Sequence, residues 1–218
     1  MCRIMVKLRR GECGIMKKLI LVSMLYQTTD LVRTIAPELE GKTVTYIPTA
    51  GIAEEVEGMV EKETSTLESL GLTVDVLEVS TSSQEEIVDS LKRNDVIFVG
   101  GGNTFFLLQE LRRSGADQIL IREVEKGKLY IGESAGSIIT CPDIGYCADM
   151  DSPEKAPNLT DYAGLNLVDF YIVPHIGNEE MGEAAEKAVE KYGSELELKA
   201  ITDEQVILVE DGRVEILE

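Results

Sequence analysis

A serine flanked by glycines is the first feature of the chain whose residue types and spacing indicate chemistry. Ser134 lies in the segment Gly132-Glu133-Ser134-Ala135-Gly136, after an apolar run at 129–131 that predicts a buried strand and before a predicted helix. This order is typical of a nucleophile elbow, in which a sharp turn lifts the serine oxygen out of the sheet. Backbone N–H groups at the start of the helix can then hold a developing oxyanion. A serine in an ordinary strand-to-helix turn is the alternative interpretation.

A serine nucleophile needs a base that takes its proton, and histidine is the usual base. His175 is the single histidine of the chain. It follows a predicted strand at 169–173, and Pro174 precedes it and Gly177-Asn178 follow it. A lone histidine is more often structural, but the carboxyl end of a strand is also where Ser134 is expected. The sequence therefore predicts that His175 serves as the base.

A third group should orient the imidazole and stabilise its charged form. Asp203 and Glu204 lie in a polar break between predicted strands at 199–202 and 206–210. Asp149 and Asp151, in the irregular segment 141–165, are rival candidates. Because the chain has 40 acidic residues, a solvated surface carboxylate is the alternative for each of the four.

A glycine-rich loop, Gly100-Gly101-Gly102-Asn103-Thr104, follows a predicted strand at 95–99. It does not complete the dinucleotide-binding pattern, and it lacks the Gly-Lys-Ser/Thr of a phosphate-binding loop. Glycines let backbone N–H groups approach a ligand closely, so the loop could face an oxyanion. A tight turn without chemistry is the other interpretation.

Composition excludes several other classes of function. The net charge of -19 argues against nucleic acid and anionic membranes as partners. No apolar run approaches the length of a membrane span. Four cysteines without a C-x-x-C pair, and one histidine, argue against a metal site. We therefore expect no metal and no cofactor, and a protein of the reducing cytoplasm.

Strands and helices alternate from residue 19 to residue 140, which predicts an α/β fold with a mainly parallel sheet covered on both faces. The length of 218 residues fits one domain, expected over 16–218, with residues 1–15 as an N-terminal extension outside the core. The glycine loop and the serine turn both fall at carboxyl ends of strands, where such sheets bind ligands.

Several local signals give more detailed expectations. A loop is expected at 48–51, followed by one helix over 53–70, and Asp30 is expected to cap a short helix that runs to residue 36. Ser83 and Glu86 predict a capping box. Asp211-Gly212 predicts a C-terminal hairpin with a type I′ turn.

In chain order, GGNTFFLLQEL at 101–111, IGESAG at 131–136, Pro174-His175 and a late acid resemble the peptidase E (aspartyl dipeptidase) family, to which the cyanophycinases are related. The resemblance runs from about residue 17 to the C-terminus. It implies a class I glutamine-amidotransferase-like fold and a catalytic triad of serine, histidine and glutamate. An actual glutamine amidotransferase is disfavoured, because it would need cysteine where the chain has Ser134.

Residue by residue, the resemblance implies Ser134 as nucleophile and His175 as base. It also implies an oxyanion and substrate-binding site at Gly101, Gly102, Asn103 and Ala135. Counting back from Gly212 without gaps puts Asp203 at the position of the family's glutamate. Glu204 keeps the residue type but needs a shift of one residue, which turns a strand side chain to the opposite face. We favour Asp203, with Glu204 as the alternative acid.

The expected function is that of a serine exopeptidase that acts on short peptides through an acyl-enzyme on Ser134. By resemblance, the substrates are dipeptides with N-terminal aspartate. Recognising that aspartate needs a cationic or hydrogen-bonding group near Ser134, and Lys155 in the irregular segment is one candidate. Another small amide or ester hydrolase, and a catalytically silent relative that binds a ligand or partner, are the alternatives. The sequence leaves open whether the protein is a monomer or a homodimer.

Overall fold

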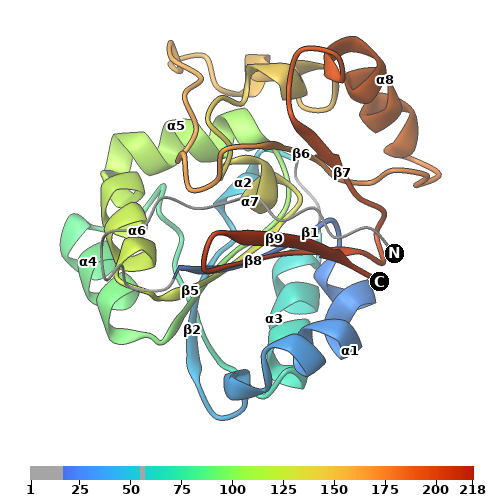
Figure 1. The fold of residues 1–218 in the computed structure, drawn as a ribbon. Helices are drawn as coiled ribbons and strands as arrows, with labels where there is room; N and C mark the ends of the chain where they lie inside the picture. The colour runs from blue at the N-terminus through green and yellow to red at the C-terminus, as the bar shows by residue number, and fades with distance from the viewer. Residues whose placement is uncertain (1–16, 55–56) are drawn as a thin grey trace, which may run out of the picture.

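A seven-stranded sheet forms the centre of the protein in the computed structural model, which describes residues 17–54 and 57–218 (Figure 1). The order of its strands is β3-β2-β4-β5-β1-β8-β9. The first five are parallel, and β8 runs antiparallel to both β1 and β9. The strands are β1 (Lys18–Val22), β2 (Thr43–Ile47), β3 (Thr73–Val76), β4 (Val96–Val99), β5 (Leu129–Glu133), β8 (Val206–Glu210) and β9 (Arg213–Leu217). The expected α/β fold with a mainly parallel sheet and a C-terminal hairpin is confirmed.

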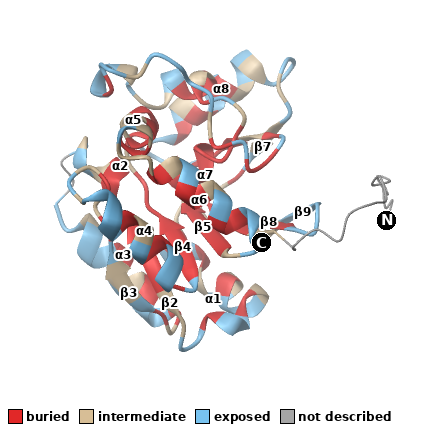
Figure 2. Cartoon of the chain, turned by 90° about the vertical axis from the view of Figure 1, so that its left-hand side faces the viewer, coloured by how far each residue is buried: buried red, intermediate tan, exposed pale blue. Residues whose placement is uncertain are grey.

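Helices cover both faces of this sheet, and Figure 2 shows buried residues along the strands between them. Alternate residues of a strand point to opposite faces, and β4 illustrates the result. Ile97 and Val99 lie in one buried cluster with the helices after β3, whereas Val96 and Phe98 lie in a second cluster with α1 and α3. The helices are α1 (Leu25–Ile35), α2 (Thr49–Ile52), α3 (Met59–Ser69), α4 (Gln84–Arg93), α5 (Thr104–Ser114), α6 (Ala116–Glu125) and α7 (Ala135–Ile138), with a 3₁₀ turn at Pro37–Leu39.

A second, two-stranded sheet lies beside the main one, and His175 follows one of its strands, as the sequence predicted. β6 (Tyr171–Val173) pairs in parallel with β7 (Leu198–Ala200), and α8 (Gly182–Tyr192) connects them (Figure 1). Both strands were expected from their sequences, but their separation from the main sheet was not. The long irregular segment before β6 contains two 3₁₀ turns, Gly145–Asp149 and Pro153–Lys155.

Two local expectations were wrong. Residues 49–52 form α2 rather than a loop, and the expected helix over 53–70 is only α3, which starts after Gly58 in a left-handed conformation with φ 75°. Asp30 does not cap a helix, because α1 already begins at Leu25 and Asp30 lies within it. The N–H of Leu25 instead donates to the Glu133 carboxylate on β5, a tertiary contact that the local pattern does not reveal.

Other local expectations were confirmed. Ser83 and Glu86 form both hydrogen bonds of a capping box at the start of α4. Asp211 and Gly212 both have positive φ, 54° and 72°, as a type I′ turn requires. The proposed extension at 1–15 lies outside the described residues. Within the described part of the chain, no helix is long and apolar enough to cross a membrane.

Candidate active site

Ser134 occupies a strained turn between β5 and α7. Its backbone has φ 48° and ψ −109°, an unfavourable conformation for a residue with a side chain. The flanking glycines permit the turn. A Cβ at Gly132 would lie 2.4 Å from the carbonyl oxygen of Gly136, and one at Gly136 would lie 2.0 Å from that of Val99. The glycine spacing is therefore a steric requirement of this elbow.

Three segments that are distant in sequence bring Ser134, His175 and Asp203 into one chain of hydrogen bonds. His175 Nε2 lies 2.9 Å from Ser134 Oγ, and its Nδ1 lies 2.8 Å from Asp203 Oδ1. Asn178 Nδ2 donates to the other carboxylate oxygen of Asp203 at 2.7 Å. Both oxygens of this acid are thus fixed, and the carboxylate holds the imidazole with Nε2 toward the serine.

His175 is buried and its backbone is unusual. It has φ 67°, and its N–H donates to Ser23 Oγ at 3.0 Å. The Ser23 hydroxyl lies 3.1 Å from the Thr202 carbonyl oxygen, to which it donates. Ser23 therefore joins the end of β1 to the histidine and to the loop that carries Asp203. Burial lowers the pKa of His175, and the neighbouring Asp203 carboxylate partly offsets this effect.

The other acids proposed for the third position lie elsewhere. Glu204 is exposed. Asp149 forms an ion pair with Lys191 at 2.7 Å. Asp151 accepts a hydrogen bond from the Thr104 N–H at 2.9 Å. Among the candidates, Asp203 is the acid in contact with His175.

The glycine loop after β4 lies against the serine turn. A side chain at Gly101 would start 3.4 Å from Ser134 Cβ, and Gly102 has φ 124° in a position where a Cβ would clash with Ala50. The Gly101 N–H is 3.5 Å from Glu63 Oε1, to which it donates weakly. The N–H of Ala135, at the first position of α7, directly follows the serine.

Asn103, which was expected at the oxyanion and substrate-binding site, forms hydrogen bonds that stabilise the backbone instead. Its side chain is fully buried, and Oδ1 accepts from the Phe106 N–H at the start of α5. Its Nδ2 donates to the carbonyl oxygen of Ser152 at 3.1 Å. Both ends of the amide are occupied, so Asn103 shapes the glycine loop and does not line the pocket.

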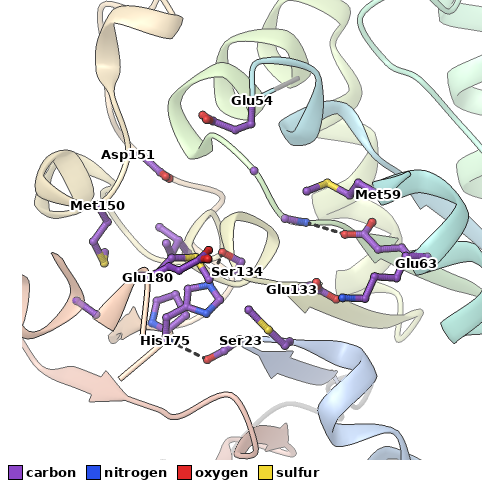
Figure 3. Close-up of a pocket in the computed structure, with 18 of the residues that line it drawn as sticks. Ser23, Glu54, Met59, Glu63, Glu133, Ser134, Met150, Asp151, His175 and Glu180 are labelled. Carbon is purple, nitrogen blue, oxygen red and sulfur yellow. Dashed lines mark hydrogen bonds between the residues drawn. The ribbon is translucent and has the colours of Figure 1, made fainter. Parts of the chain in front are cut away.

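A pocket of about 700 Å³ opens over Ser134 and His175 (Figure 3). It is lined by more acids than cations. The acids are Glu54, Glu57, Glu63, Glu133, Asp151 and Glu180, and the cations are Lys62 and Lys155. The Lys155 ammonium group donates to the Ala53 carbonyl oxygen at 2.7 Å, and that of Lys62 lies 3.6 Å from the centroid of the Tyr26 ring.

Two of these acids, the buried Glu63 and the half-buried Glu133, have raised pKa values. Burial raises the pKa of Glu133 to about 8, and the negative charge of Glu63 adds to this shift. Burial also raises the pKa of Glu63 to about 7, although hydrogen bonds from Tyr46 and from the Gly101 N–H oppose it. Both shifts favour the protonated carboxyl over the carboxylate.

Sequence reasoning did not identify four residues that hold or line this site. Ser23 and Asn178 could have been found, because Ser23 is the last residue of the strand predicted at 19–23 and Asn178 lies in the loop that carries His175. Glu133 lies inside the serine motif itself. Glu63 gave no signal, because it is one of many glutamates in a helix.

Comparisons with known proteins identify the family of the chain. The model of peptidase family S51 matches residues 19–217. An uncharacterized peptidase of Listeria monocytogenes is 47% identical over 91% of this chain and 97% of its own length. Peptidase E of Nostoc sp. is 29% identical over 81% of this chain and 72% of its own length.

A solved structure gives the same result in three dimensions. The crystal structure of a peptidase E candidate from Listeria monocytogenes EGD-e superposes with a TM-score of 0.88 at 46% identity, covering 93% of this chain and 98% of the other. The family model spans nearly the whole described chain, and the relatives carry the same fold. The chain belongs to peptidase family S51, the peptidase E family of serine peptidases.

Proposed function

We propose that the protein is a serine exopeptidase that hydrolyses short peptides through an acyl-enzyme on Ser134. The observation that carries the proposal is the continuous hydrogen-bond chain from Ser134 Oγ through His175 to Asp203. Burial favours the neutral imidazole near pH 7, and the neutral form is the one that can accept a proton.

The reaction follows from this arrangement. Ser134 Oγ attacks the peptide carbonyl carbon while His175 Nε2 takes the hydroxyl proton. His175 then gives that proton to the leaving amine as the C–N bond breaks, which leaves an ester on the serine. A water molecule, deprotonated by His175, hydrolyses the ester. Asp203 stabilises the charged imidazole in both steps.

The N–H groups of Ala135 and Gly102 are the proposed donors to the oxyanion. Ala135 directly follows the serine, Gly102 lines the same pocket, and Gly102 has a backbone conformation that favours glycine. The Gly101 N–H is less suited, since the Glu63 carboxyl already accepts from it. Removing one such donor typically costs about 10²–10³-fold in kcat.

The proposal extends to the residue that the enzyme prefers at the N-terminus of its substrate. By resemblance the substrates are dipeptides with N-terminal aspartate, whose side chain would need Lys62 or Lys155. Both cations line the pocket, but six carboxyl groups line it with them. This charge favours a second candidate, a peptidase of the same mechanism whose preferred first residue is neutral.

Hydrolysis of a dipeptide panel tests the proposal. Asp-Leu is compared with Glu-, Asn-, Ala- and Leu-initiated dipeptides, with wild type and Ser134→Ala in parallel. We expect turnover to fall about 10³-fold or more in Ser134→Ala. Cleavage of Asp-Leu alone supports aspartyl specificity, whereas cleavage of the neutral dipeptides supports the second candidate. No cleavage of any member by wild type would favour the silent relative.

If Asp-Leu is cleaved, Lys62→Met and Lys155→Met identify the cation that recognises aspartate. Each substitution removes the charge and keeps much of the apolar stem. The variant that raises KM for Asp-Leu without raising it for Ala-Leu marks the recognising residue. Equal effects on both peptides would show a general effect on the pocket instead.

A further inference from the structure

Glu133, the residue before the nucleophile in the chain, lines the same pocket as Ser134 with its carboxyl group (Figure 3). Its Oε2 accepts from the Leu25 N–H at 3.0 Å. In the described part of the chain no donor forms a hydrogen bond with Oε1. Every buried side-chain oxygen in that part has a hydrogen-bond partner, so Oε1 is not buried. Oε1 therefore faces the open space of the pocket. It lies 4.0 Å from the point where a Gly101 side chain would start, and Ser134 Cβ lies 3.4 Å from the same point.

Glu63 is a second carboxyl that lines the pocket, and it lies near enough to Glu133 for its charge to raise the pKa of Glu133. It is buried, and it is held by the Tyr46 hydroxyl and by the Gly101 N–H. In the described residues no lysine or arginine forms an ion pair with either glutamate, although the charge of Lys62 acts on both from a greater distance. Two carboxyls near each other in a poorly solvated site are costly to ionise together, and a cation entering beside them would relieve this cost.

The chemistry of an N-terminal residue fits this position. In a peptide the α-nitrogen is only about 2.5 Å from the carbonyl carbon of its own residue. When that carbon approaches Ser134 Oγ to about 3–3.5 Å, the ammonium group must lie close to the serine as well. Glu133 is the neighbour of Ser134 in the chain and has a free oxygen there. Asp151 is engaged by Thr104, and the other pocket carboxylates are exposed.

We propose that Glu133, supported by Glu63, binds the α-ammonium group of the substrate's first residue and so restricts the site to peptides with a free amino terminus. This inference deepens the proposed function and rests on the same pocket. It explains why a peptidase with so acidic a pocket would act as an exopeptidase: Glu133 and Glu63 recognise the amino terminus of the substrate rather than one of its side chains.

Binding to the Ser134→Ala protein tests the inference without turnover. The two probes are Ala-Leu and propionyl-leucine, which differ only in the α-ammonium group. Affinities are measured by isothermal titration calorimetry at pH 7, in Ser134→Ala alone and with Glu133→Gln added. Glutamine keeps an oxygen that can accept from the Leu25 N–H, and thermal melting confirms that each variant is folded. Glu54→Gln is the matched control, because Glu54 is an exposed carboxylate of the same pocket.

We expect Ser134→Ala to bind Ala-Leu about 10- to 100-fold more tightly than propionyl-leucine, as a charge-assisted hydrogen bond implies. Glu133→Gln should remove most of this difference by weakening Ala-Leu alone, Glu63→Gln should reduce it less, and Glu54→Gln should leave it unchanged. In the active protein, Glu133→Gln should raise KM far more than it lowers kcat.

Equal affinity for the two probes, or no binding of Ala-Leu at millimolar concentration, would overturn the inference. So would a Glu133→Gln variant that keeps the full preference. Selective binding of Ala-Leu by a protein without peptidase activity would support the inference and refute the proposed function.

Discussion

Replacing Asp203 by asparagine should stop catalysis by turning the proton of His175 to the wrong nitrogen. In the structure Asp203 Oδ1 faces His175 Nδ1 at 2.8 Å, and Oδ2 accepts from Asn178 Nδ2 at 2.7 Å. In Asp203→Asn the amide oxygen is held toward the Asn178 donor, so the new NH₂ group points at Nδ1. Nδ1 must then accept, and Nε2 carries the proton and cannot take one from Ser134.

The expected loss in kcat is about 10³- to 10⁴-fold, as for wrong-tautomer variants of other serine triads. Steady-state hydrolysis of the best dipeptide of the panel measures it. Glu204→Gln is the matched control, because Glu204 is an exposed neighbour with the same charge, and it should keep activity within about twofold.

Adding Asn178→Asp to Asp203→Asn should restore part of the activity. The new carboxylate at position 178 accepts from the amide, which turns the amide oxygen toward Nδ1 and restores the correct tautomer. Asp203→Asn with activity within tenfold of wild type, or a large loss in Glu204→Gln, would refute the reasoning.

Three further predictions concern the same site. The pH profile of kcat, measured with saturating substrate, should rise through a pKa below about 6.5, because burial lowers the pKa of His175 and its neutral form is the base; a rise of kcat centred above pH 7 would contradict this. Gly136→Ala should lower stability by about 1–3 kcal/mol or more in urea unfolding, and abolish activity, because its Cβ would lie 2.0 Å from the Val99 carbonyl oxygen. Ser137→Ala should cost about 1–3 kcal/mol in the same assay, because its buried hydroxyl accepts from the Val22 N–H at 3.0 Å; an unchanged unfolding midpoint would show that this contact is not needed.

Local sequence signals predicted much of the fold and two of the side chains that meet at the candidate site, Ser134 and His175. The apolar runs of β4 and β5 are continuous because helices bury both faces of the sheet, and this pattern is visible in the sequence. The elbow was equally visible, since steric limits fix the spacing of its glycines.

What the sequence could not predict depends on tertiary contacts. The start of α1 depends on Glu133 from another element. The residue pattern left both Asp203 and Glu204 open, and only the alignment implied by the family resemblance favoured Asp203; in the structure the direction of one loop sets Asp203 against His175 and Asn178. The separation of β6 and β7 from the main sheet follows from packing rather than from residue type. Glu63 shows the limit clearly, because its burial distinguishes it from the solvated glutamates around it.

The acyl-enzyme on Ser134 is the central claim, and rapid-quench kinetics with alanine p-nitrophenyl ester tests it most directly. With this activated ester, deacylation becomes the slow step. An acyl-enzyme on Ser134 predicts a burst of one p-nitrophenol per protein molecule; mass spectrometry of the acid-quenched protein should show an added alanyl group, and its peptide fragments should locate that group on Ser134. Ser134→Ala should show neither. Linear release without a burst or adduct, or the same adduct in Ser134→Ala, would contradict the account.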